Sequence, residues 1–263
     1  MKIHVLAENK SIRPDVAAEH GLSLFLERPA GNILFDMGAS PSFADNAVKM
    51  GVDLTSVELA VISHGHYDHG GGLRRFLEIN HHAPVWVSPH AFERHFNGVG
   101  KEIGLDKSLE NHPRVRVVPS SVFSLGPGLQ LVGATEIPPR YPVNNGGMTA
   151  MVGEQRFPED FRHEQYLLLE EDGKRILITG CSHGGILNIA AHFRPNILVG
   201  GFHLMHCNPV TDAPALANLA AELMQYADCY RTGHCTGDAA GQVLKERMEQ
   251  RLHCFSAGQV MEC

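Results

Sequence analysis

Short apolar runs, separated by polar or Gly/Pro-containing turns, recur along the first half of the chain. Runs of this length that are rich in β-branched and large apolar residues predict β-strands. A longer amphipathic segment that opens at Ser40-Pro41 and closes at Gly51 predicts a helix. The predicted strands of this half are residues 3–7, 22–26, 32–36, 59–63, 84–88, 115–119 and 129–132, and the predicted helices are residues 41–50, 72–79 and 90–96.

The second half repeats this rhythm of strands and helices. Two apolar runs on either side of Glu171-Asp172-Gly173 predict a hairpin, and an apolar stripe along residues 213–226 predicts an amphipathic helix. Two β-rich halves, each with outer helices, predict an α/β (α+β) protein, arranged as an αββα sandwich in a single domain over residues 1–263. The strands of this half are residues 165–170, 174–179, 196–200, 229–232 and 253–255, and the helices are residues 186–193, 213–226 and 239–251.

Two segments, residues 97–114 and 133–162, show no clear hydrophobic period. Long loops inside compact enzymes are more often substrate loops than linkers, so we expect both to be insertions or substrate loops near the functional site. Arg140 lies in the second segment and could hold a phosphate or a carboxylate. A surface salt bridge is the alternative for this residue.

Composition and charge restrict the class of protein. Apolar residues at 43% suffice for a sizeable core, and charged residues at 19% argue against disorder. A net charge of −7 provides no basic footprint for nucleic acid or for an anionic membrane surface. We therefore expect a small-molecule substrate, and metal ions would supply the positive charge that an anionic substrate requires. The sequence leaves open whether the chain forms a homo-oligomer.

Cellular location is suggested by what the sequence lacks. No segment approaches the roughly 20 apolar residues of a membrane span. The first residues also lack the apolar stretch and cleavage site of a signal peptide. The six cysteines form no Cys-x-x-Cys pair, which is typical of free thiols in a reducing compartment. We expect a cytoplasmic protein.

Residues 61–73 contain a cluster of candidate metal ligands, which directly follows the apolar run at residues 59–62. His64 and His66 can aim two imidazoles at one ion, and Asp68 and His69 can hold a second. With 17 histidines in the chain, a solvated His-rich loop is the alternative. The fixed spacing and the glycines that let the backbone turn tightly favour a metal site.

Three further histidines follow apolar strands in the second half. His183 lies in Gly180-Cys-Ser-His-Gly-Gly185, His203 in Gly200-Gly-Phe-His-Leu204 and His234 in Gly233-His-Cys-Thr-Gly237. Each segment alone is a weak signal, but His183 and His234 together with the first motif complete a plausible shell for two metal ions. His203 could contact a substrate phosphate or donate a proton, and a structural role is equally compatible with its position.

His-x-His-x-Asp-His after an apolar strand resembles the signature of the metallo-β-lactamase-fold hydrolases. The resemblance implies an αββα sandwich of that type, two metal ions and a strand ending in Asp-x-Gly beneath the metal site. Asp36, followed by Gly38, would then orient a ligand histidine.

One departure from the family pattern concerns Cys181, which stands where the family usually has a bridging aspartate. Either His183 supplies the third nitrogen ligand, or His163 does so and Cys181 binds the second metal. The glycine-flanked setting that His183 shares with the other ligands favours His183.

A narrower resemblance rests on five motifs, which are the metal motif, Glu136-Ile-Pro138 and the three strand-end segments that carry His183, His203 and His234. Together they are similar to the dihydropterin-methyl-aminobenzene-ribofuranosyl phosphate synthases of methanopterin biosynthesis. This resemblance implies a metal-dependent transferase that couples a dihydropterin-methyl diphosphate to an aminobenzene ribofuranosyl phosphate.

Three functions follow from these residues. Two cations held close together can lower the pKa of water, so that hydroxide attacks an ester, lactone or phosphoester. A dinuclear metal-dependent hydrolase, with Asp68 both binding metal and orienting the nucleophile, is therefore the main prediction. The transferase is the alternative, and a non-catalytic metal-binding module is a third. Zinc is the expected metal, with iron, manganese or nickel also compatible with the ligands.

Overall fold

The computed structural model describes all residues from 1 to 263, and these form two compact units. Unit 1 consists of Met1–Ser120, Asn144–Gln165 and Ser256–Cys263, and unit 2 consists of Ser121–Val143 and Tyr166–Phe255. The chain therefore passes between the two units four times, and neither unit is continuous in sequence. The single domain expected over residues 1–263 stays a prediction.

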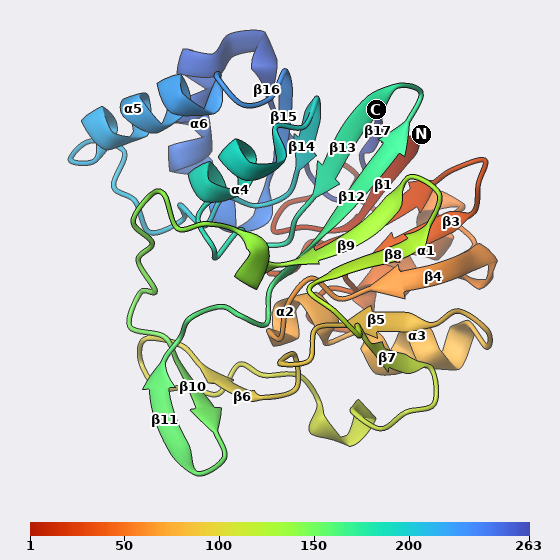
Figure 1. Ribbon diagram of the computed structural model, residues 1–263. Helices are drawn as coiled ribbons and strands as arrows, with labels where there is room; N and C mark the ends of the chain where they lie inside the picture. The colour runs from red at the N-terminus through yellow and green to blue at the C-terminus, as the bar shows by residue number, and fades with distance from the viewer. The chain divides into compact units, whose positions relative to one another are not determined.

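Unit 1 is built on a seven-stranded sheet with the strand order β17-β1-β2-β3-β4-β5-β7 (Figure 1). The pairs from β17 to β3 are antiparallel, and those from β3 to β7 are parallel. The carboxyl ends of β3, β4 and β5 therefore lie at the same edge of the sheet. The strands are β1 (Lys2–Ala7), β2 (Ser23–Glu27), β3 (Asn32–Phe35), β4 (Val57–Val61), β5 (Val85–Val87), β7 (Val115–Val117) and β17 (Val260–Glu262).

Two helices, α1 (Ser42–Met50) and α3 (Leu73–Ile79), pack against this sheet. Phe43 of α1 and Phe76 of α3 are fully buried in the core cluster that the helices share with the strands. Both helices lie within a residue of their predicted ranges, because each has a clear apolar stripe and a stop signal. The short helix α2 (Tyr67–Gly70) was not predicted. Short 3-10 turns complete the unit at η1 (Leu54–Ser56) and η2 (Lys107–Leu109).

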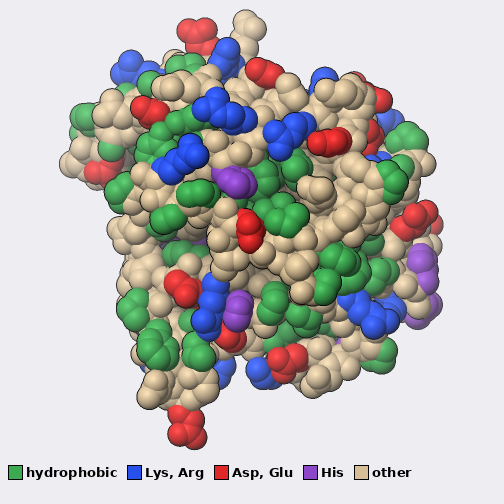
Figure 2. Space-filling view, in the orientation of Figure 1, with side chains coloured by type: hydrophobic (Ala, Val, Ile, Leu, Met, Phe, Trp, Pro, Cys, Tyr) green, Lys and Arg blue, Asp and Glu red, His purple; other side chains and the backbone are tan.

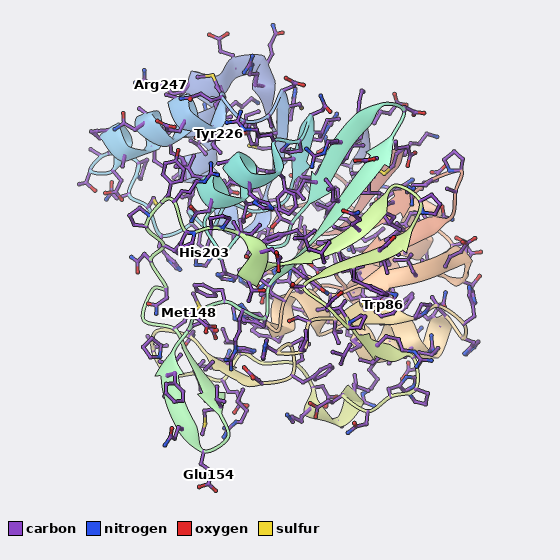
Figure 3. All side chains as sticks on the ribbon, viewed as in Figure 1. Trp86, Met148, Glu154, His203, Tyr226 and Arg247 are labelled. Carbon is purple, nitrogen blue, oxygen red and sulfur yellow. The ribbon has the colours of Figure 1, made fainter.

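A second, three-stranded sheet in unit 1 corrects two predictions. Its order is β11-β10-β6, with β6 at Arg94–Phe96, β10 at Thr149–Val152 and β11 at Gln155–Pro158. The helix expected at residues 90–96 is therefore wrong, and residues 133–162 are not wholly irregular. The β10–β11 hairpin is mostly exposed, with Glu154 at its tip (Figure 3), so it lacks the alternation of apolar residues that reveals a half-buried strand.

Unit 2 is built on its own seven-stranded sheet, in the order β16-β15-β14-β13-β12-β9-β8. The pairs from β13 to β16 are parallel, so the carboxyl ends of these four strands lie at one edge. The hairpin predicted around Gly173 is confirmed as β12–β13, and β8 was not predicted. The strands are β8 (Val122–Gly126), β9 (Leu129–Gly133), β12 (Gln165–Glu171), β13 (Lys174–Ile178), β14 (Ile197–Val199), β15 (Cys229–Thr232) and β16 (Leu252–Cys254).

Helices α4 (Ile186–Phe193), α5 (Ala213–Leu223) and α6 (Asp238–Met248) lie beside the parallel strands of unit 2 (Figure 1). Ile189, Leu223 and Leu244, one from each helix, are fully buried in the core of this unit. Short 3-10 turns occur at η3 (Ala134–Glu136), η4 (His234–Thr236) and η5 (Glu249–Arg251). Each unit therefore joins strands to helices as the predicted α/β class requires.

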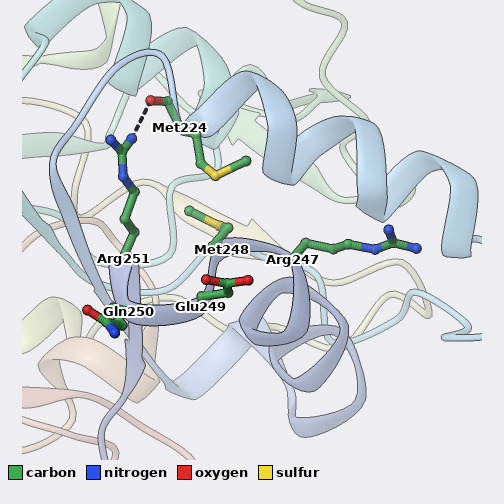
Figure 4. A pocket seen from close by; sticks show the side chains of 6 residues that line it. All are labelled: Met224, Arg247, Met248, Glu249, Gln250 and Arg251. Atoms are coloured by element: carbon green, nitrogen blue, oxygen red, sulfur yellow. Dashed lines mark hydrogen bonds between the residues drawn. The ribbon is translucent and has the colours of Figure 1, made fainter.

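On the face that Figure 2 shows, charged side chains of both signs are scattered among the others. No helix combines the length and apolar character that a membrane span requires. An open cavity of about 530 Å³ at the end of α6 is lined by Met224, Arg247, Met248, Glu249, Gln250 and Arg251 (Figure 4), and none of these is a predicted site residue.

Asn46 tests how unit 1 is held together. Its buried amide donates to Leu6 O and Ala17 O at 2.8 Å each and accepts from Ala17 N at 2.9 Å. We expect Asn46→Ala to lower the free energy of unfolding by roughly 2–4 kcal/mol in urea denaturation, because it leaves buried polar groups unsatisfied. Val48→Ala on the same helix, where the side chain is 78% exposed, should change it by less than about 0.5 kcal/mol. Equal effects of the two substitutions would contradict this assignment.

Candidate metal centre

The metal motif begins where β4 ends. Strand β4 ends at Val61, two residues earlier than predicted, so Ser63 and His64 lie on the turn that follows it. Helix α2 begins at Tyr67, immediately after His66, and places Asp68 and His69 in its single turn. All four candidate ligands of this motif are buried. The ring centroid of His64 lies 4.6 Å from that of His66 and 4.1 Å from that of His69. The local fold therefore brings the three imidazoles together.

Asp36 lies beneath this motif, at the end of the neighbouring strand β3. Its carboxylate is fully buried and accepts from Ser63 N at 2.6 Å and from Ser63 Oγ at 2.7 Å. His69 Nδ1 lies 2.6 Å from the same carboxylate. The backbone of Asp36 has φ of 60°, a left-handed conformation that Asp and Asn adopt more readily than most residues. The turn after β3 thus points a carboxylate at the turn after β4.

These hydrogen bonds fix the tautomers of two histidines. Because the Asp36 carboxylate can only accept, His69 must carry its proton on Nδ1. The Ser63 hydroxyl donates its proton to Asp36, so it must accept from His64 Nδ1, which lies 2.8 Å away. When each ring is neutral, Nε2 is then the nitrogen that keeps its lone pair. This is the arrangement found beneath metal-binding histidines, where a carboxylate orients the ring.

Asp68 lies beside His69, on the side of the ring away from Asp36. Its carboxylate oxygen Oδ2 lies 3.7 Å from His69 Nε2 and 3.4 Å from His20 Nε2. His20 could not be predicted as a site residue from the sequence, because it stands outside any motif. Its side chain is 47% exposed. Its position comes from the segment before β2, where Leu22 N donates to Asp68 O. The structure therefore adds an accessible imidazole beside the Asp68 carboxylate.

His163 was one candidate for the third nitrogen ligand. Its Nδ1 accepts a hydrogen bond from Gly65 N at 2.8 Å, and its Nε2 lies 3.6 Å from Glu159 Oε1. Burial, with the neighbouring His95 and His66, lowers the pKa of His163 well below its usual value, so the ring is neutral. A neutral ring that accepts at Nδ1 carries its proton on Nε2. This geometry disfavours His163 as a ligand and leaves His183 as the better candidate.

In unit 2 the remaining candidates follow three adjacent parallel strands. His183 comes after β13, His203 after β14 and His234 after β15. The donor atoms of Cys181, His183 and His203 lie within 4.8 Å of one another. His203, labelled in Figure 3, has its ring centroid 4.3 Å from that of His183. The carboxyl ends of parallel strands are a common place for binding sites in α/β proteins.

The backbone at these strand ends is strained. Ser182, His203 and His234 have φ of 59°, 53° and 51°, in the left-handed region that few non-glycine residues adopt. Side-chain hydrogen bonds hold two of the turns together, because Ser182 Oγ donates to Gly201 O at 2.7 Å and Thr236 Oγ1 accepts from Phe202 N at 2.9 Å. Strain of this kind is concentrated at functional sites.

Two buried thiols lie in the same part of unit 2. Cys235 Sγ is 3.5 Å from Cys181 O and accepts from His203 N at 3.3 Å. Burial opposes ionisation of the Cys235 thiol, but hydrogen bonds with Cys181 and His203 outweigh it and hold the pKa of Cys235 well below its usual value. Cys181 is 3% exposed, as expected for a thiol beneath a site.

Arg140 is the predicted site residue for which the structure provides least support. Its side chain is exposed, on the loop after η3. The next residue, Tyr141, is fixed to α4 because its N and O pair with the Asn188 amide at 2.7 and 2.9 Å. The loop is therefore anchored, but no acidic or anionic partner places Arg140 in the site.

Comparison with known proteins decides the family. A profile described as the metallo-beta-lactamase superfamily matches residues 17–193, which is more than half of the chain. The chain belongs to the metallo-β-lactamase superfamily. It is similar, at 30% identity and a TM-score of 0.83 over 100% of this chain and 99% of the other, to the crystal structure of Tm1679, a metal-dependent hydrolase of the beta-lactamase superfamily. The predicted fold class is thereby confirmed, and the protein is a metal-dependent enzyme of the metallo-β-lactamase fold.

Two further relatives bear on the narrower resemblance. The chain is 24% identical to a 7,8-dihydropterin-6-methyl-4-(beta-D-ribofuranosyl)-aminobenzene-5'-phosphate synthase of Methanocaldococcus jannaschii, over 100% of this chain and 96% of that protein. This match is consistent with the predicted resemblance to the synthases of methanopterin biosynthesis. Zinc-bound PqqB from Methylobacterium extorquens has a TM-score of 0.62 at 11% identity, over 100% of both chains, which supports the fold alone.

Asp36→Asn tests the hydrogen bonds beneath the metal motif. An asparagine tolerates the same left-handed backbone, but its amide can donate where the carboxylate could only accept. We expect the affinity for zinc, measured by competition with a chelating dye, to fall roughly 10–100-fold. Asp172→Asn is the matched control, because Asp172 also has a left-handed backbone, with φ of 52°, but is exposed in the β12–β13 turn. Equal affinities for the two variants would refute the orienting role of Asp36.

Proposed function

We propose that this protein is a dinuclear metal-dependent hydrolase that cleaves an ester, lactone or phosphoester bond in a small, anionic molecule. The observation that carries the proposal is the hydrogen-bond chain from His64 through Ser63 to Asp36 and on to His69. This chain presents two Nε2 lone pairs from a buried turn, which is the requirement of a nitrogen-ligated metal site. Membership of the metallo-β-lactamase superfamily supports the same conclusion.

We assign the metal ligands from both halves of the chain. The proposed ligands are His64, His66, Asp68, His69, His183 and His234. The assignment of the last two rests on their glycine-flanked positions after parallel strands and on the family signature, with Cys181 close to His183 as a neighbouring thiol. Imidazole and carboxylate donors suit zinc best, and they also accept iron, manganese or nickel.

The donor set fits divalent cations, because it combines neutral imidazoles with a buried carboxylate. When bound, such cations would lower the pKa of water and would stabilise negative charge that develops on a substrate oxygen. Asp68 would orient the attacking water through its carboxylate. His20, beside Asp68 and half exposed, can exchange a proton with solvent.

Unit 2 would supply the groups that contact the substrate. His203, half-buried after β14, is in a position to donate a proton or a hydrogen bond. Arg140, on the anchored loop after η3, offers a cation for a phosphate or carboxylate of the substrate. The substrate is proposed to be anionic on the basis of Arg140 and the metal ions, because in a chain of net charge −7 the positive charge that binds an anion must be supplied locally.

A transferase is the second candidate function. The similarity to the aminobenzene-5'-phosphate synthase of Methanocaldococcus jannaschii extends along the full length of the chain and supports this reading. The same ligands would then hold cations that bind a diphosphate leaving group while a second organic substrate attacks. Product analysis separates the two functions. Incubation with a dihydropterin-methyl diphosphate and an aminobenzene ribofuranosyl phosphate gives a coupled product only from a transferase, whereas a hydrolase consumes water.

His64→Ala tests the proposed ligands. We expect elemental analysis to give a metal content well below that of the wild-type protein, because the substitution removes a ligand imidazole. Hydrolysis in a screen of 4-nitrophenyl acetate, an acyl lactone and bis(4-nitrophenyl) phosphate should fall at least 100-fold. His192→Ala on α4, where the histidine is exposed, should leave metal content and turnover unchanged. Full activity of metal-free His64→Ala protein would disprove the proposal.

A further inference from the structure

Unit 1 contains a second group of buried titratable side chains that the proposed function does not use. It consists of His95 on β6, Glu159 just after β11, and His163 four residues later. His95 and Glu159 have side chains only 1% exposed, and His163 is fully buried. Charged groups are rarely buried this deeply unless their hydrogen bonds are satisfied, so this group requires an explanation.

Glu159 joins the two histidines. Its Oε2 lies 2.7 Å from His95 Nδ1, and its Oε1 accepts from Phe161 N at 3.2 Å and faces His163 Nε2 at 3.6 Å. The rings of His95 and His163 stack, with centroids 4.0 Å apart and planes inclined at 26°. One carboxylate and two stacked imidazoles therefore form a single compact unit.

This group can be compared with a metal site, because the donor atoms of His95, Glu159, His163 and His66 lie within 4.8 Å of one another. The hydrogen bonds argue against that role. His163 Nδ1 already accepts from Gly65 N, and both nitrogens of His95 face oxygens, Glu159 Oε2 at 2.7 Å and His90 O at 3.3 Å. The Nδ1 lone pair of His163 is therefore already engaged, and both nitrogens of His95 are directed at acceptor oxygens, which indicates a role in positioning.

The group acts on the metal motif at Gly65, the residue between His64 and His66. A Cβ atom at Gly65 would lie 2.4 Å from Ala91 O and 2.8 Å from His95 Nε2, so the backbone can approach His95 this closely only because residue 65 is glycine. The single N–H of Gly65 donates to His163 Nδ1 at 2.8 Å. The peptide between the two proposed ligands is thus held from both sides.

A second connection joins His95 to the other end of the motif. His95 O accepts from Ile103 N at 2.8 Å, and Ile103 O accepts from Tyr67 N at 2.9 Å. Tyr67 directly follows His66 and begins α2. The segment after β6 therefore holds the backbone after His66, and His163 holds the backbone before it.

We propose that Glu159, His95 and His163 form a buried positioning network that holds the Gly65 peptide and so sets the direction of His64 and His66. The inference rests on the proposed function, since it takes these two histidines as metal ligands. His163 acts through the acceptor at Nδ1. Glu159 holds His95 through Nδ1, and His95 supports His163 through its stacked ring.

Two substitutions of His163 test the proposal, because Asn and Gln place a side-chain oxygen at different depths. In His163→Asn the amide oxygen takes the place of Nδ1 and can still accept from Gly65 N, whereas in His163→Gln it reaches the place of Nε2. The probe is cobalt(II), titrated into metal-free full-length protein and followed by its visible absorption. We expect His163→Asn to bind within about threefold of wild type with the same spectrum, and His163→Gln to bind roughly 10–100-fold more weakly.

Glu159→Gln provides a third variant of unchanged size, should His163→Gln fail to fold as judged by circular dichroism. Its amide nitrogen cannot accept a hydrogen bond, so we expect cobalt affinity to fall about tenfold. His81→Asn and His81→Gln, at an exposed histidine of the same unit, are the matched controls and should both bind as wild type does.

The outcomes separate this inference from the proposed function. If the wild-type protein binds cobalt and all variants bind equally well, the network has no positioning role and the inference is overturned, while the metal site stands. If His163→Gln retains affinity and His163→Asn loses it, His163 is a ligand through Nε2 and the inference is wrong. If the wild-type protein binds no cobalt, the proposed function fails and this inference fails with it.

Discussion

The buried carboxylate of Asp36 is the group on which the arrangement of the metal motif depends. Burying a charge is costly unless hydrogen bonds replace the lost water, and here Ser63 N, Ser63 Oγ and His69 Nδ1 provide them. Those same bonds connect the turn after β3 to the turn after β4. The carboxylate therefore serves the fold and the chemistry together, because the donors that stabilise it also orient the imidazoles. The left-handed backbone at Asp36 is tolerated for this reason.

The two units use the same physical arrangement to assemble functional side chains. In each, parallel strands end at a common edge, and tight turns place histidines two to five residues after a strand. A strand end is a rigid point of attachment, so a side chain on the turn that follows it is well positioned. Left-handed residues occur at these turns in both units, at Asp36 in unit 1 and at His203 and His234 in unit 2. Hydrogen bonds hold the turns together in both, through Asp36 and His163 in unit 1 and through Ser182 and Thr236 in unit 2.

The sequence predicted those parts of the protein that are encoded locally. Helix α4 and strand β15 have the predicted ranges, because an apolar period and clear stop signals mark them. The role of Asp36 as a neighbour of the metal motif could be anticipated only through family resemblance, and its partner Ser63 was missed because serine after a strand is common. The β6-β10-β11 sheet was missed because β6 pairs with β10 across more than fifty positions of the chain and because β11 is wholly exposed. His95 and Glu159 were missed for the same reason, since neither belongs to a motif and only the fold brings them together.

Hydrogen bonds lead to Asp36 directly from His69 and through Ser63 from His64. They orient both rings for metal binding before any metal arrives. The most direct test is the tautomer of each ring in metal-free protein, read from the nitrogen-15 chemical shifts and long-range proton couplings of the imidazoles. We expect each ring, in its neutral form, to carry the proton on Nδ1. A proton on Nε2 of either ring, or rapid exchange between the two tautomers, would contradict it.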